Sequence, residues 1–376
     1  MTGGPLSLRA LNRATLHRQL LLHRTAQPVG QAVAHLAGMQ AQAPLAPYVG
    51  LWTRLAGFRP AHLENLLTER AVVRAHVMRN TVHLTDARDF TAFRPLFQPL
   101  IDRALRGAFG RRLAGVDLAA VTRIARALLA ERPLTRVQLA AELAPHWPDH
   151  DPGSLAYAAT HLLPLVQVPP RGLWSQTGPA TFSLASAWLG APDGPPDPAV
   201  AVEQLVLRYL AAYGPASVAD VRAWSGLSRL REVTERLGDR LRPLVGPDGA
   251  PLLDLPEALS PDPDVPAPPR FLPEYDNLLL SFADRSRVIR HDRPVPLPPG
   301  HGASAGTLLI DGQWQANWKI IRTEPKGGQR QAMLRVEPFV RLGAADREAI
   351  EAEGAGLLAF AAAGADVRDV QFSPVG

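Results

Sequence analysis

Cysteine is absent from this chain of 376 residues, and only two lysines occur, Lys319 and Lys326. Without cysteine the chain cannot form a disulfide, a thiolate metal site or a cysteine nucleophile. Arginine carries nearly all the other positive charge, so almost no side-chain amine is present for Schiff-base chemistry. These absences leave little room for covalent catalysis through sulfur or nitrogen.

No apolar stretch is long enough to span a bilayer, and the N-terminus lacks the apolar core of a signal peptide. We therefore expect a soluble, cytoplasmic protein without membrane contact. Hydrophobic residues make up 46% of the chain and charged residues 20%, as in chains that bury ordinary cores. The net charge of +5 is compatible with a polyanionic partner. However, GC-rich coding, which favours arginine, alanine, proline and glycine together, explains the composition without one.

Three stretches of the chain repeat one pattern, a helix followed by a helix–turn–helix and a short β-hairpin. Apolar spacing, prolines and capping residues predict these elements. The first stretch covers about 6–85, and its strands are expected to meet at Arg79-Asn80. Its expected elements are helices at 6–22, 28–39 and 60–67 and strands at 72–78 and 81–84.

The second and third stretches cover about 117–186 and 199–256. Asp117 and Thr135 can cap helices in the second stretch, and Gly226 lies in a tight turn typical of a helix–turn–helix in the third. The second is expected to hold helices 118–130, 136–143 and 152–163 and strands 165–168 and 173–176. The third is expected to hold helices 200–213, 218–224 and 229–237 and strands 244–245 and 252–253.

A Pro-rich linker covers residues 260–269, and the remainder of the chain is rich in strand patterns. The expected elements there are strands at 277–283, 307–310, 315–323 and 331–340 and a closing helix at 348–363. The sequence therefore predicts an α+β protein in which helical units with hairpins precede a β-rich region.

Two glutamines stand two residues apart where the helix expected at 28–39 ends, in the run Gly38-Met39-Gln40-Ala41-Gln42-Ala43-Pro44. The residue before Pro44 is pushed toward extended geometry. In an extended segment, side chains i and i+2 share a face, so the amides of Gln40 and Gln42 can converge on one point. The ordinary alternative is a polar helix terminus without a functional role.

Four stretches together resemble one known family. They are Leu8-Arg9-Ala10-Leu11-Asn12-Arg13-Ala14-Thr15-Leu16, Leu36-Ala37-Gly38-Met39-Gln40-Ala41-Gln42, Arg79-Asn80-Thr81-Val82-His83-Leu84 and Arg270-Phe271-Leu272-Pro273-Glu274-Tyr275-Asp276-Asn277. The chain is similar to the winged-helix DNA glycosylases typified by AlkZ and YcaQ. The family's catalytic motif is Gln-x-Gln in the AlkZ branch and Gln-x-Asp in the YcaQ branch, so Gln42 places the chain on the AlkZ side.

The resemblance implies an α+β fold of three tandem winged-helix units followed by a C-terminal β-rich, barrel-like region. We expect winged helix 1 with the Gln-x-Gln motif at 1–116, winged helix 2 at 117–198, winged helix 3 with the Pro-rich linker at 199–269, and the β-rich region at 270–376. The implied partner is double-stranded DNA with an alkylated purine, bound by a monomer that uses no cofactor and no metal.

The residue types of the motif limit the chemistry. A neutral guanine is a poor leaving group and needs general-acid help and a carboxylate, whereas a guanine alkylated at N7 is already cationic and labile. Two amides are then enough: Gln42 orients a water toward C1′, and Gln40 holds that water or the deoxyribose. We therefore expect excision of N7-alkylguanine-type adducts, possibly including interstrand crosslinks, in self-resistance or alkylation repair. The shortage of lysine predicts no lyase activity.

Further residues are candidates for contact with DNA or for lining the site. The hairpin at 320–331 has a basic, glycine-rich tip, and Lys326, Arg330 and Arg322 are expected to contact DNA; a solvated turn is the alternative. Thr81 and His83 can line the site, although His83 can equally be a structural histidine. The cluster Arg103, Arg106, Arg111 and Arg112 suits phosphate contact or a solvated helix end. The run His146–Asp151 lacks the further ligands of a metal site.

A non-catalytic, DNA-binding transcriptional regulator is the rival function. Winged helices mostly serve that role, and a fold does not settle a function. A regulator usually carries one recognition helix rich in base-reading side chains and commonly dimerises. Here three units occur in one chain, and the clearest recognition helix, 229–237, has an ordinary surface composition.

Overall fold

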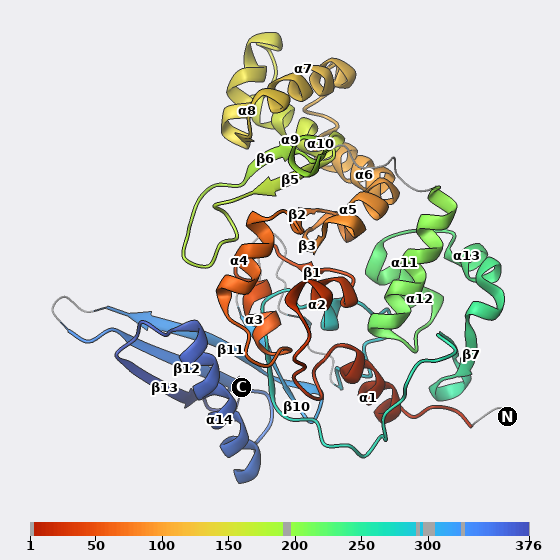
Figure 1. Cartoon of the computed structure of the whole chain (residues 1–376), viewed down its shortest axis with the longest axis vertical. Coiled ribbons are helices and arrows are strands. Elements are labelled where there is room, and N and C mark those ends of the chain that lie inside the picture. Colours follow the sequence, from red (N-terminus) through yellow and green to blue (C-terminus); the bar gives the residue numbers. More distant parts are fainter. Residues whose placement is uncertain (1–3, 191–196, 291–293, 296–304, 325–327, 376) are drawn as a thin grey trace.

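The computed structural model describes residues 4–190, 197–290, 294–295, 305–324 and 328–375 (Figure 1). Helices and strands are mixed in an α+β arrangement, as expected. In the first segment, two helices follow a short strand and lead into an antiparallel hairpin. Its elements are α2 (Val29–His35), β1 (Met39–Gln40), α3 (Ala46–Trp52), α4 (Pro60–Thr68), β2 (Val72–His76) and β3 (Val82–Asp86).

The second segment has the same order of elements, and the expected caps form. Asp117 accepts backbone N–H bonds from Ala119 and Ala120, and Thr135 forms a capping box with Gln138. The elements are α7 (Leu118–Glu131), β4 (Leu134–Thr135), α8 (Arg136–Leu143), α9 (Pro152–Leu162), β5 (Leu165–Val168), β6 (Thr181–Leu184) and α10 (Ala185–Leu189). Two helices, α5 (Ala87–Phe93) and α6 (Gln98–Phe109), connect the first segment to the second.

The third segment matches its expected helix–turn–helix. Ser217 forms a capping box with Asp220, and Gly226 takes the left-handed conformation that ends the helix (φ 79°). The elements are α11 (Pro198–Tyr213), α12 (Val218–Ser225), α13 (Leu230–Leu237), β7 (Arg242–Val245) and β8 (Pro251–Asp254).

The hairpins of the first two segments join in one antiparallel sheet with the order β1-β3-β2-β5-β6-β4. Arg74 of β2 pairs with Gln167 of β5, which connects the two segments through backbone hydrogen bonds. The strand expected at 173–176 is wrong, because turn hydrogen bonds occupy this stretch and the hairpin closes later, at β6.

The C-terminal region is an open five-stranded sheet with the order β13-β12-β11-β10-β9, packed against α14 (Ala344–Ala361). Within the described residues its edge strands do not pair, so the sheet does not close into the expected barrel. Its strands are β9 (Arg270–Leu272), β10 (Gly306–Ile310), β11 (Gln313–Thr323), β12 (Gln331–Pro338) and β13 (Val367–Phe372).

The strand expected at 277–283 is also wrong. Asp276 accepts a hydrogen bond from the backbone N–H of Leu278, and this cap turns the chain into the 3₁₀-helix η6 (Asn277–Leu280). An apolar run of this length cannot be assigned to strand or helical turn by periodicity alone.

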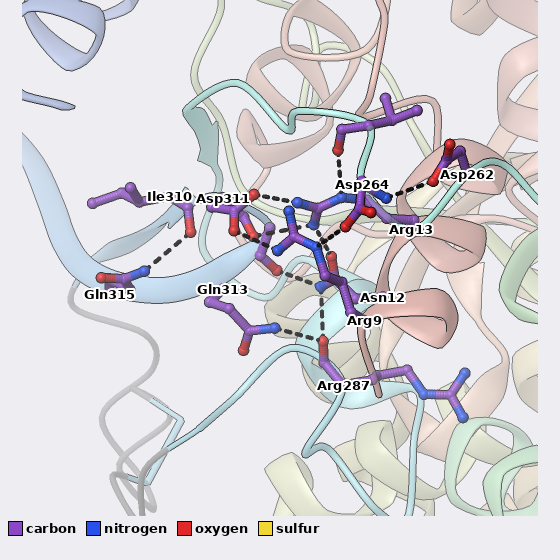
Figure 2. A network of polar contacts seen from close by, with 12 residues as sticks. Arg9, Asn12, Arg13, Asp262, Asp264, Arg287, Ile310, Asp311, Gln313 and Gln315 are labelled. Atoms are coloured by element: carbon purple, nitrogen blue, oxygen red, sulfur yellow. Dashed lines mark hydrogen bonds and ion pairs between the residues drawn. The ribbon is translucent and has the colours of Figure 1, made fainter. Parts of the chain in front are cut away.

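Helix α1 (Leu8–Arg18) packs on α11 and also reaches the C-terminal sheet (Figure 2). The Asn12 amide donates to the carbonyls of Arg287 and Gly312, both at 2.7 Å. Arg13 is an ion-pair partner of Asp311 in the turn between β10 and β11. Residues about 300 positions apart are thereby joined by buried polar contacts.

We expect Asn12→Ala to lower the free energy of unfolding by about 2 kcal/mol, because the carbonyl of Gly312 loses its side-chain donor, while the carbonyl of Arg287 keeps only its bond from Gln313 among the described side chains. Arg9→Ala is the matched control: it removes one partly exposed ion pair with Asp311 of the same turn and one with the exposed Asp264, and it is expected to cost less than about 1 kcal/mol. Urea titration of the two variants measures the difference, and equal losses would contradict the role assigned to Asn12.

Candidate functional site

The expected helix at 28–39 is shorter than predicted, and this places Gln40 on a strand. Helix α2 ends at His35, and Ala37 and Gly38 take left-handed conformations (φ 53° and 93°). A Cβ at residue 38 would lie 3.3 Å from the carbonyl oxygen of Leu84, so glycine fits this close approach. The chain then runs antiparallel to β3, with Gln40 opposite His83.

Both glutamine amides are held by the β2–β3 hairpin. The Oε1 of Gln40 accepts a hydrogen bond from Nη2 of Arg79 at 2.8 Å, and the Oε1 of Gln42 accepts one from the backbone N–H of Val82 at 3.3 Å. Gln40 is 7% exposed, whereas Gln42 is exposed. Each partner is a pure donor, so each amide oxygen faces the hairpin and its orientation is defined.

Arg79 joins three separate parts of the chain at this point. It sits with Asn80 in a left-handed turn (φ 53° and 55°). Besides Gln40, its guanidinium donates to the carbonyl of Trp224 at the end of α12 (2.7 Å) and to Oδ1 of Asn277 in η6 (2.9 Å). The planar guanidinium fork makes these bonds at once, which a lysine ammonium cannot reproduce with the same geometry.

Arg74 supports the backbone that carries the motif. Its guanidinium, 2% exposed, donates to the carbonyls of Ala41 (3.0 Å) and Pro44 (3.3 Å) on either side of Gln42. Gly172, with φ 95°, packs so closely that a Cβ there would lie 2.7 Å from Cδ of Arg74. The loop after β5 and the Gln-x-Gln segment are therefore locked to the same arginine.

Two buried positive charges flank the motif. Their partners are carbonyl and amide oxygens, and no carboxylate of the described residues joins them in an ion pair. Burial lowers the pKa of Arg74 and of Arg79 to about 10, so both remain protonated at neutral pH. Arg79 thereby fixes the Oε1 of Gln40, whereas Arg74 fixes the backbone carbonyls on either side of Gln42.

A cavity of about 10 Å³, near the smallest size that holds one water molecule, is lined by Gln40, Asn277 and Asp276. Asp276 is the one acidic residue among those described that line it, and Arg54 binds it in a bidentate, buried ion pair at 2.9 and 3.0 Å. Asn277 also donates to the carbonyl of Gly38. The carboxylate nearest the motif is therefore already occupied.

The structure brings Thr81 and His83 to the same corner as the glutamines. His83 is fully buried, and its Nδ1 lies 3.1 Å from the carbonyl oxygen of Thr81. Burial, reinforced by the charge of Arg79, lowers the pKa of His83 to about 3. Burial likewise lowers the pKa of the neighbouring His76 to about 4. Both imidazoles are neutral at pH 7 and serve as packed, uncharged supports of the strand.

Of the residues expected to contact DNA, Arg322 belongs to β11 and Arg330 directly precedes β12, and these two strands extend away from β1 (Figure 1). Arg322 donates to the carbonyl of Ala361, and Arg330 forms an ion pair with Asp366 at 3.6 Å. Lys326 lies outside the described residues. The four arginines of the other candidate cluster are exposed at and beyond the end of α6: Arg103, Arg106, Arg111 and Arg112.

Three residues of the site did not stand out in the sequence. Arg79 and Asn277 belong to stretches that pointed to a family, but no spacing indicated that they would bond each other. Arg74 had no signal, since an arginine within a strand pattern usually faces solvent. The described part of the chain holds no group of three His, Asp or Glu side chains arranged for a metal, and no helix there is suited to cross a membrane.

The AlkZ-like DNA glycosylase family model matches residues 33–360 of the chain. Among solved structures, the DNA glycosylase AlkZ of Streptomyces sahachiroi is similar in fold, with a TM-score of 0.76 and 22% sequence identity. This similarity covers 98% of this chain and 100% of the other. No curated protein matches the chain. The structural similarity concerns the fold, whereas the family match concerns the sequence over most of its length.

The buried histidines predict acid sensitivity. Between pH 6.5 and the lowered pKa values, the folded chain holds fewer protons than the unfolded chain. The contribution of the two histidines to the free energy of unfolding is therefore fully present above about pH 6.5 and decreases as the pH falls. We expect His83 alone to account for about 2 kcal/mol between pH 7 and pH 4.5. His83→Asn should reduce the pH dependence of urea unfolding by that amount. The exposed His23, changed to Asn, is the control, and an equal reduction there would contradict the assignment.

Proposed function

The chain belongs to the AlkZ-like DNA glycosylase family, and on that premise we propose that it hydrolyses the N-glycosidic bond of cationic N7-alkylguanine-type adducts in double-stranded DNA. The catalytic residues of the proposal are Gln40 and Gln42. The observation that carries it is the fixed orientation of their two amides by Arg79 and by the backbone of Val82.

The two amides can have different hydrogen-bonding roles toward one water molecule. Gln42 is exposed, and its oxygen has a second lone pair with which it accepts a hydrogen bond from water. Gln40 presents its NH₂ group to the water oxygen or to the deoxyribose. The oxygen of the water adds to C1′ while the C1′–N9 bond breaks. The bonding electrons pass to the purine and cancel its positive charge, and a water proton leaves to solvent.

The charges around the motif favour such a restricted substrate. The carboxylate lining the cavity, Asp276, is bound by Arg54 and by a backbone N–H, so it is not available as a general base. His83 is neutral and buried, so it cannot protonate a neutral base at pH 7. A lesion that brings its own positive charge needs neither group. Unhooking of bis-N7-guanine crosslinks, in self-resistance or alkylation repair, follows if the site admits a tethered base.

The product is proposed to be an intact abasic site. A lyase step requires an amine that attacks C1′. One lysine, Lys319, lies within the described part of the chain, where its Nζ is 3.4 Å from Glu337 in the C-terminal sheet. It belongs to β11, not to the elements that carry the glutamines.

The repeated order of elements supports three winged-helix units at 1–116, 117–198 and 199–269, ahead of the sheet at 270–376. We propose that a monomer binds duplex DNA with these units and with Arg322 and Arg330 of the C-terminal sheet. In this proposal Thr81 lines the lesion side of the motif, and the buried His83 is a structural support behind it.

An oligonucleotide duplex with one N7-methylguanine tests the substrate class. We expect base release well above the spontaneous rate, with strand cleavage only after alkali, and no release from a matched uracil duplex. Borohydride should trap no covalent adduct. Efficient uracil release would contradict the charge argument. Tight sequence-specific binding without base release would instead favour the transcriptional regulator.

Variants of the motif test the assigned roles. We expect Gln42→Ala to lower the single-turnover excision rate about 100-fold with DNA binding retained, because water positioning is lost. The loss of excision rate caused by Gln40→Ala should be smaller than this or comparable to it. Arg79→Lys keeps the charge but not the fork, and we expect about a ten-fold lower rate at unchanged DNA affinity.

Arg229→Lys is the control for Arg79, since Arg229 is also left-handed (φ 58°) but exposed. Its excision rate should equal that of the parent. If the Gln40 and Gln42 variants both excise at the parent rate, the catalytic assignment is wrong. If Arg79→Lys excises at the parent rate while the Gln40 and Gln42 variants are slower, only the supporting role of Arg79 is wrong.

A further inference from the structure

A cavity of about 450 Å³ lies at the loop end of the paired strands β11 and β12, and the glutamines of the motif are not among its lining residues. Three parts of the chain form it: the loop after β5, the hairpin strands and the C-terminal end of α14. Its walls include Trp174, Phe360, Arg322 and Arg330. The size lies within the range of cavities that hold small organic ligands.

One wall of this cavity is aromatic and firmly held. The rings of Trp174 and Phe360 lie 5.1 Å apart between centroids. The backbone N–H of Trp174 donates to Glu64 at 2.8 Å, and its ring packs on Tyr48 at 5.0 Å. Tyr48 belongs to α3, the helix that follows the Gln-x-Gln segment, and its hydroxyl donates to the carbonyl of Gly172. The wall is thus fixed to the element that follows the glutamines.

The lining of the cavity also includes two guanidinium groups. Arg322 donates to the carbonyl of Ala361, at the end of α14, at 3.0 Å. Arg330 pairs with Asp366 at 3.6 Å, but 56% of its side chain is exposed. An exposed pair of this kind is weak and can exchange its carboxylate for a phosphate.

We propose that this cavity binds an unpaired nucleotide of DNA outside the excision site. The base stacks on Trp174, and Arg330 contacts the adjoining phosphate. Stacking on an aromatic side chain beside a guanidinium is the usual way in which proteins hold unpaired bases without sequence preference. The inference rests on the proposed function only in taking DNA as the substrate. A free nucleotide has the same chemistry, and the experiment separates the two sources.

The test measures affinity for undamaged DNA by fluorescence anisotropy, so it does not depend on excision. The probes are a fully paired duplex and the same duplex with a short unpaired bubble. We expect the parent protein to bind the bubble about ten-fold more tightly. Trp174→Ala and Arg330→Gln should each remove most of this preference, whereas Trp174→Phe should keep it because phenylalanine still stacks.

Trp188→Ala is the matched control, since Trp188 is likewise half-buried but packs against Arg70 elsewhere on the protein. It should leave the preference unchanged. The proposal is overturned if Trp174→Ala or Arg330→Gln weakens binding of both probes equally, or leaves both unaltered. Competition by guanosine monophosphate at concentrations that do not affect duplex binding would also overturn it, in favour of a free-nucleotide site. If the thermal unfolding temperature of Arg330→Gln equals that of the parent, misfolding is excluded as the cause of a lost preference for the bubble duplex.

Discussion

Buried guanidinium groups hold this protein together. Arg54 binds Asp276 in a bidentate pair, Arg18 binds Asp254 in another, and Arg287 donates to the carbonyl of Pro215. The two ion pairs join residues more than 200 positions apart. Removing one partner of such a pair leaves an uncompensated buried charge, which costs several kcal/mol. The planar guanidinium group of arginine makes several hydrogen bonds at fixed angles. Because the chain has only two lysines, arginine provides nearly all of its positively charged hydrogen-bond donors.

Buried arginines also hold the candidate site in place. Arg74 fixes the backbone on either side of Gln42, and Arg79 fixes the amide of Gln40 while it touches α12 and η6. Positions held by several buried bonds do not reorganise when a substrate arrives, and preorganised dipoles contribute most to catalysis by neutral groups. The backbone around Gln42 and the amide of Gln40 are therefore held by two charged side chains whose hydrogen bonds go to oxygen atoms of the protein.

Local signals in the sequence predicted much of the fold. The caps at Asp117 and Thr135 formed as expected because a cap depends on residues two or three positions apart. The strand predictions at 173–176 and 277–283 failed because turns form there instead. Distant partners hold the residues just before these turns: the hydroxyl of Tyr48 donates to the carbonyl of Gly172, and Arg54 binds Asp276. The sheet that joins β2 to β5 has no local signal at all.

The sequence by itself determined which chemistry is available: amides at Gln40 and Gln42, no thiol and almost no amine. It also determined the family, because short motifs survive as residue types in a fixed order. Only the tertiary structure decided which protein groups hold the oxygens of those amides, and that Arg54 binds Asp276. The reason is that hydrogen-bond direction and ion pairing depend on partners from α12, η6 and the β2–β3 hairpin, which lie far apart along the chain.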